Sequence, residues 1–160
     1  MEILKKIIII LLSTLYLTSC GFTPIYSKKN LDFQINNIQF EGDREIKAIL
    51  LSNLSAYKTK KKDKYNYDLN IKSEKKVEIA SKNTKGEATV YKININSIVE
   101  VFLDDKLLLT KHYNNSSIYS SEKKIIKMKE VESRNLSNLS SKLASEIILT
   151  LSLANTKSDF

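Results

Sequence analysis

The chain has 160 residues and a net charge of +8, with one cysteine, one histidine and one proline. This length is enough for one compact domain with a hydrophobic core, and it is too short for two domains of ordinary size. A single cysteine excludes a disulfide within the chain. The positive charge favours polyanionic partners such as nucleic acid or anionic lipid, although the abundance of Lys, Ile and Asn is also typical of an AT-rich genome.

The N-terminal segment has the parts of a secretory signal peptide. A basic start precedes the apolar stretch Ile7–Leu17, and small residues lie just before Cys20. A membrane-spanning helix needs about 20 apolar residues, so this stretch is too short to remain as an anchor. We therefore predict that residues 1–19 are removed, with cleavage between Ser19 and Cys20.

The residues around the cut, Leu17-Thr18-Ser19-Cys20, resemble the lipobox of bacterial lipoproteins. The resemblance implies that the Cys20 thiol receives a diacylglycerol and that the new N-terminus is acylated. More than one acyl chain gives stable anchoring, because each buried methylene contributes roughly 0.8 kcal/mol. An exported protein with an unmodified Cys20 could alternatively form a disulfide with another chain. Export also makes nucleic acid the least suitable polyanion, and no nucleic-acid partner is expected.

Residues 20–30 form an extended tether, and the folded domain is expected over 31–154. Its first strand, Phe33–Phe40, alternates apolar and polar residues with a slip at Asn36-Asn37. Asp43 then suits the N-cap of a helix, and apolar residues recur at helical spacing from Ile46 to Tyr57. The lysine run that follows suits the C-terminus of this helix.

Three strands are predicted next, because the apolar period changes from helical to alternating. The first begins at Tyr65 and continues to Ile79, and the second covers Tyr91–Leu103. A tight turn at Asp104-Asp105 leads to a third strand over Leu107–Tyr113. Residues Asn114–Ser121 are polar, and they are predicted to form a loop.

A last amphipathic helix is predicted over Glu130–Leu151, followed by a frayed tail over residues 155–160. The element order is therefore β-α-β-β-β-α. Two helices that each bury one face, together with alternating strands, favour an α+β fold. We expect a two-layer sandwich, with a mostly antiparallel four-stranded sheet and both helices on one face.

The sequence contains no recognisable catalytic or metal-binding constellation. His112 is the only histidine, and its place in a predicted strand favours a structural or surface role. Asp104 and Asp105 are adjacent, so they are better explained as turn formers than as paired acids. The expectation is a protein that is not an enzyme and that has no catalytic residues, metal or cofactor beyond the lipid on Cys20.

Lysines gather in two clusters. One is the run between Lys58 and Lys64, and exposed lysines of this kind also protect strand edges from aggregation. The functional interpretation is contact with phosphate or carboxylate groups of lipopolysaccharide. The candidate contacts belong to the second cluster, which consists of Lys72, Lys75, Lys76, Lys82 and Lys85.

The segment Cys20-Gly21-Phe22-Thr23-Pro24-Ile25-Tyr26, together with the element order, resembles the LptE family of lipopolysaccharide-assembly lipoproteins in its alphaproteobacterial branch. Tyr113-Asn114, the Ser-rich segment with Tyr119 and the last helix also match that branch. The resemblance covers nearly all the mature chain, but only the N-terminal heptapeptide is reasonably specific.

The resemblance implies an outer-membrane lipoprotein that plugs the LptD β-barrel, helps it fold and assists transport of lipopolysaccharide to the cell surface. Gly21 suits the outer membrane, because an aspartate after the lipidated cysteine is the usual inner-membrane retention signal. The alternative is a generic envelope lipoprotein that binds peptidoglycan or anionic lipid through its lysine clusters.

Overall fold

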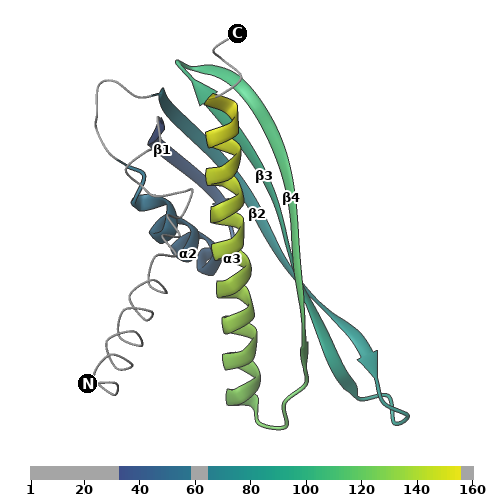
Figure 1. Cartoon of the computed structure of the whole chain (residues 1–160). Coiled ribbons are helices and arrows are strands. Elements are labelled where there is room, and N and C mark those ends of the chain that lie inside the picture. Colours follow the sequence, from purple (N-terminus) through teal and green to yellow (C-terminus); the bar gives the residue numbers. More distant parts are fainter. Residues whose placement is uncertain (1–32, 59–64, 156–160) are drawn as a thin grey trace, which may run out of the picture. The chain divides into compact units, whose positions relative to one another are not determined.

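The computed structural model describes residues 33–58 and 65–155 (Figure 1). The chain divides into two units, residues 1–30 and 31–160, and everything described belongs to the second. The elements, in chain order, are β1 (Phe33–Gly42), α2 (Arg44–Ser55), β2 (Tyr65–Lys82), β3 (Ala88–Leu103), β4 (Lys106–Ser120) and α3 (Ile125–Asn155). This order confirms the predicted α+β fold. The predicted signal peptide and tether, residues 1–30, lie outside the described residues.

The sheet has the strand order β1-β2-β3-β4. β2, β3 and β4 form an antiparallel meander, whereas β1 lies parallel to β2 at one edge. The parallel pair needs a crossover, and α2 provides it. The register between β1 and β2 shifts between Ile35 and Asn37, which confirms the predicted slip in the first strand.

The turn between β3 and β4 has the predicted residues. Asp104 and Asp105 both have positive φ, 49° and 60°. Two successive residues with positive φ characterise the two-residue hairpin turn whose twist matches that of the flanking strands, and aspartate tolerates this conformation better than most residues.

The prediction that Asn114–Ser121 is a loop was wrong. β4 continues to Ser120, and Asn114–Ser120 pair with the β3 residues Val90–Asn96. Asn114 and Ser116 lie on the exposed side of the sheet, whereas the side chains of Asn115 and Ser117 bond to α3. Asn115 donates to a Glu146 carboxylate oxygen at 2.8 Å, and Ser117 donates to Asn135 at 2.7 Å.

Helix α2 begins as predicted and ends earlier than its lysine run suggested. The Asp43 carboxylate accepts hydrogen bonds from the backbone N–H groups of Glu45 and Ile46, which confirms it as the N-cap. The helix ends at Ser55, and its last turn contains no basic residue. The predicted contact of the lysine run with the helix C-terminus stays a prediction, because residues 59–64 lie outside the described residues.

One continuous core joins the sheet to both helices. Alternate residues of the strands and one stripe of each helix are buried together, and both helices lie in front of the sheet in Figure 1. α3 begins at Ile125, earlier than the sequence suggested. Its buried residues are Leu136, Leu139, Ser140, Leu143, Ala144, Ile147 and Leu151.

The sheet changes width at Gly42, where β1 ends opposite Ser73. We call the part up to this row the four-stranded half and the part beyond it, including β2 residues Glu74–Lys82, the three-stranded half. A Cβ on Gly42 would lie 1.9 Å from the Ser73 carbonyl oxygen, and the φ of Gly42 is +129°. The close approach and the positive φ both require glycine here.

Over residues 33–58 and 65–155, neither helix has a stretch that is long and apolar enough to cross a bilayer.

Candidate functional site

The predicted lipidation site, Cys20, and the cleavage position at Ser19 lie outside the described residues, and both stay predictions. The five candidate lysines are all described, and they occupy three different settings. These settings determine which of the ammonium groups face solvent and which are held by carboxylates.

Lys72 and Lys76 lie on the solvent-exposed side of β2. Lys72 forms an ion pair with Glu41 of β1 at 3.0 Å, and Lys76 forms one with Glu78 on its own strand at 2.9 Å. The hydrogen bond between Lys76 and Glu78 raises the pKa of the lysine and lowers the pKa of the carboxyl. Both lysines are exposed and partly neutralised by a neighbour.

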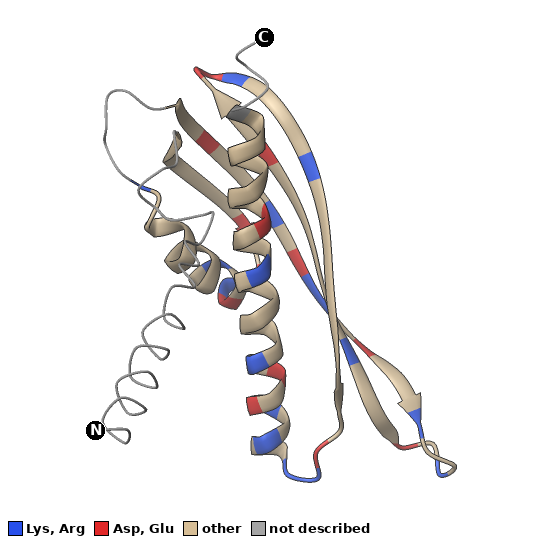
Figure 2. Ribbon diagram, in the orientation of Figure 1, with Lys and Arg blue, Asp and Glu red and all other residues tan. Residues whose placement is uncertain are grey.

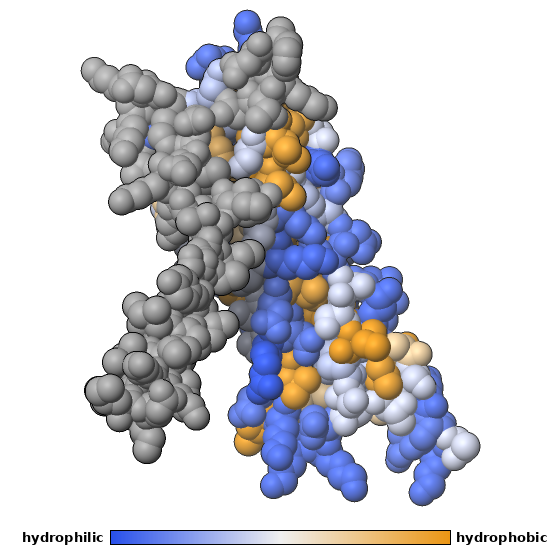
Figure 3. Space-filling view, viewed as in Figure 1, coloured by the Kyte–Doolittle hydropathy of each residue, from blue (hydrophilic) through white to orange (hydrophobic). Residues whose placement is uncertain are grey.

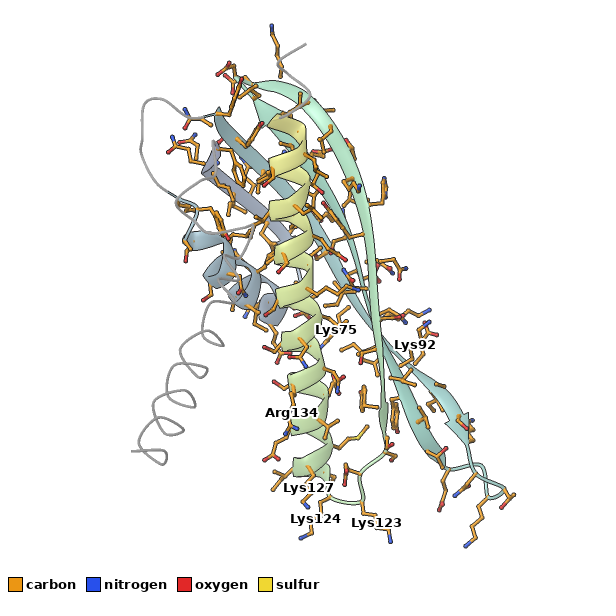
Figure 4. All side chains as sticks on the ribbon, in the orientation of Figure 1. Lys75, Lys92, Lys123, Lys124, Lys127 and Arg134 are labelled. Atoms are coloured by element: carbon orange, nitrogen blue, oxygen red, sulfur yellow. The ribbon has the colours of Figure 1, made fainter. Side chains whose placement is uncertain are left out.

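Lys75 points to the opposite side of β2, between the two helices (Figure 4). Its ammonium nitrogen lies 3.9 Å from Asp43, 3.5 Å from Glu45 and 3.6 Å from Glu132. Its side chain is 24% exposed. Lys75 therefore connects β2 to the N-terminus of α2 and to α3, which is a structural role.

Lys82 and Lys85 lie at the exposed end of the β2–β3 hairpin, where the structure gives neither an ion pair within the described ranges. The turn is organised by Asn83, whose side-chain oxygen accepts from the backbone N–H groups of Lys85 and Glu87. This geometry presents both ammonium groups to solvent, so these two lysines are the most available of the five candidates.

A second group of cations lies at the start of α3, and the sequence analysis missed it. Lys123, Lys124 and Lys127 lie at the lower end of this helix in Figure 4, and blue residues gather there in Figure 2. The first turn of α3 contains no acidic residue. Because a helix N-terminus is itself positive, these lysines add to the same potential. The sequence signal was lysine where a first turn usually has Asp or Glu.

The groups that could suggest catalysis are separated. His112 is exposed on β4 and pairs in register with Ile98 of β3. Asp104 and Asp105 form the turn that joins β3 to β4. Among the described residues, no group of His, Cys, Asp and Glu could hold a metal ion.

Apolar side chains are exposed near both groups of lysines. Val77 and Ile79 on β2 are 39% and 51% exposed, and Ile125 and Ile126 at the start of α3 are 76% and 73% exposed. Orange patches interrupt the hydrophilic surface in Figure 3. Cations beside exposed apolar groups suit an amphipathic ligand that carries anionic groups.

The fold is similar to that of several bacterial lipoproteins of known structure. The rare lipoprotein B of Shewanella oneidensis matches with a TM-score of 0.62 and 11% identity, over 78% of this chain and 100% of that chain. A lipoprotein B from Nitrosomonas europaea matches with a TM-score of 0.59 and 13% identity, over 79% and 86%. A minor lipoprotein from Acinetobacter baumannii matches with a TM-score of 0.55 and 11% identity, over 77% and 95%.

No protein-family model matches the sequence, and no curated protein matches it. At these low identities, the structural likeness shows a common fold and does not show the activity or the partners of this chain.

Proposed function

We propose that this chain is a lipoprotein of the bacterial envelope, anchored through Cys20. The observation that carries the proposal is the fold that it shares with lipoproteins from three bacteria, together with the lipobox-like Leu17-Thr18-Ser19-Cys20. Neither observation would be sufficient alone, because a short motif occurs by chance and a fold hosts many functions.

The finer proposal is a non-enzymatic role as plug and assembly partner of an LptD-like outer-membrane β-barrel in lipopolysaccharide transport. It rests on the resemblance of Cys20–Tyr26 to the LptE family. The surface is compatible with such a role, because the lumen of a large barrel is polar and the exposed side chains of α3 and of the β2–β3 hairpin are mainly polar.

Within this proposal, lipopolysaccharide phosphates would contact the exposed cations at the hairpin and at the start of α3. Lys82 and Lys85 are the candidates from β2, and Lys123, Lys124 and Lys127 extend the cationic surface. Lys75 is less suitable, because three carboxylates already surround its ammonium group.

Purification from outer membranes tests the partnership. Tagged protein extracted in mild detergent is expected to bring down a large β-barrel protein, and depletion of the chain is expected to reduce lipopolysaccharide at the cell surface. Recovery of the protein alone, with normal surface lipopolysaccharide after depletion, would contradict the barrel role and leave the lipoprotein assignment intact.

Metabolic labelling with palmitate tests the anchor. We expect the wild-type protein to be labelled and to sediment with membranes, and Cys20→Ala to lose both properties. Ser13→Ala, within the predicted signal peptide, is the control and should be labelled normally. Labelling of Cys20→Ala would show that the lipid is attached elsewhere.

The alternative function is binding of anionic lipid by a generic envelope lipoprotein. The lysines at the N-terminus of α3 favour it, because a helix dipole strengthens their potential. Binding to anionic vesicles should then fall steeply with salt and weaken in Lys123→Gln/Lys124→Gln. Binding that does not depend on salt would count against this alternative.

A further inference from the structure

The side of the sheet that faces away from the core is a second surface, which includes Lys72 and Lys76 but lies apart from Lys75 and from the lysines at the start of α3. Side chains alternate along a strand, so residues between the core positions share this side; we call it the open face. Both helices lie in front of the sheet in Figure 1, and the open face is at the rear of that view. On β2 and β3 it includes Asn70, Lys72, Lys76, Lys92, Asn96 and Glu100.

Two hollows of about 400 and 380 Å³ lie side by side on the open face, and they share Lys72 and Ile98. Together they cross all four strands, because Glu41, Lys72, Ile98 and His112 lie opposite one another in register. Four strands span about 14 Å at the usual spacing. The hollows therefore suit an extended ligand that lies across the strands.

Four amide side chains line these hollows beside the charged ones. Asn70, Asn96, Asn114 and Gln39 all line them. Asn114 donates a hydrogen bond to the side-chain oxygen of Asn96 at 2.8 Å. That bond uses one donor of Asn114 and one acceptor position of Asn96, and it leaves further donors and acceptors on both amides for a ligand.

The charge of the hollows differs from that of the whole chain. Carboxylates of Glu41, Glu74 and Glu100 line them, whereas Lys72 is the lining lysine and already pairs with Glu41 at 3.0 Å. An excess of carboxylates repels phosphate groups. A phosphate-bearing lipid or nucleic acid is therefore a poor ligand for these hollows, although it suits Lys82, Lys85 and the lysines at the start of α3.

A ligand for this surface should carry no anionic group and should be extended and rich in hydrogen-bonding groups, with some apolar area to cover Ile98. We propose that the open face binds a neutral glycan strand that carries hydroxyl and acetamido groups, as the backbone of a cell wall does. Amide side chains match this chemistry, because each offers both a donor and an acceptor. The inference goes beyond the barrel partnership and does not depend on it.

Calorimetric titration with tri-N-acetylchitotriose tests the proposal, using the full chain purified in mild detergent. The wild-type protein is expected to bind the sugar, and Asn96→Ala/Asn114→Ala to bind it roughly ten-fold more weakly, since about two hydrogen bonds are lost. Both positions are exposed, so the fold should be retained, and circular dichroism checks this. Asn53→Ala, at an exposed position of α2 on the other side of the sheet, is the control and should bind the sugar as the wild type does.

Three results would overturn the proposal: no binding of the sugar by the wild-type protein, equal binding by the asparagine variant, or displacement of the sugar by glucosamine 6-phosphate at lower concentration than by chitotriose itself. Loss of the barrel partner in a separate co-purification would not affect it. The two proposals therefore fail in distinguishable ways.

Discussion

The two halves of β2 have the same alternation of apolar and polar residues, but the apolar side chains are buried in one half and exposed in the other. In the four-stranded half, Tyr67, Leu69 and Ile71 are at most 2% exposed. In the three-stranded half, Val77 and Ile79 continue the same alternation and are 39% and 51% exposed. The difference arises because β1 ends at Gly42 and α2 turns back from that point. One half of the strand thus belongs to the core, and the other leaves apolar side chains exposed.

The largest expected effect is a core truncation in the four-stranded half. Leu69→Ala should lower the free energy of unfolding by about 2–5 kcal/mol, because it leaves a cavity at a fully buried position. Ile79→Ala, on the same strand, should cost less than about 1 kcal/mol, because Ile79 is already half exposed. Urea unfolding measures both. Equal losses would show that the two halves do not differ in packing.

The next effect lies at the boundary between the halves. Gly42→Ala should destabilise the protein by more than about 2 kcal/mol, because its Cβ meets the Ser73 carbonyl and its φ is +129°. Gly86→Ala is the matched control. Its φ is +82°, but nothing lies within 4 Å of the added carbon, so a loss of about 1 kcal/mol is expected. Thermal unfolding of both variants checks the order.

A smaller effect is expected where Lys75 connects three elements at the start of the three-stranded half. Lys75→Ala should cost about 1 kcal/mol, because its three carboxylate neighbours lose their shared cation. Added salt should reduce the difference from wild type. Lys72→Ala, which removes one exposed pair with Glu41, should change stability little. A larger loss for Lys72→Ala than for Lys75→Ala would contradict this assignment.

The smallest expected effect is a decrease in the free energy of unfolding at alkaline pH. Burial, followed by the charge of Tyr65, raises the pKa of Tyr67 above its ordinary value of 10.0. A raised pKa in the folded state means that the stabilisation is complete below pH 10.0 and is lost as the pH rises through the folded value. Stability measured from pH 9 to 12 should therefore fall less steeply in Tyr67→Phe. An unchanged slope would exclude this tyrosine as a cause.

Local signals predicted the element order and several details of it. The slip at Asn36-Asn37 corresponds to the register shift in β1, and Asp43 is the N-cap of α2. Asp104-Asp105 form the turn. Each of these features depends on a few neighbouring residues, whose backbone preferences are visible in the sequence.

Local signals failed where partners are distant in the chain. Residues 114–120 resemble a polar loop, but β3 supplies their backbone partners and α3 binds Asn115 and Ser117. The candidate lysines show the same limit. Lys72 and Lys75 are three residues apart on one strand, so they face opposite sides, and only the positions of α2 and α3 reveal that Lys75 is held by carboxylates.

The sequence by itself determined the order of the helices and strands, the alternation that defines a core side of the sheet and the lipobox-like motif at Cys20, because these depend on local periodicity and spacing. The tertiary structure decided which apolar and cationic groups remain exposed. β1 ends at Gly42, whose backbone lies too close to Ser73 for any side chain, and β2 continues beyond this last pair. The exposure of a side chain on the sheet depends on which helix or strand packs against it, and that element is distant in the sequence.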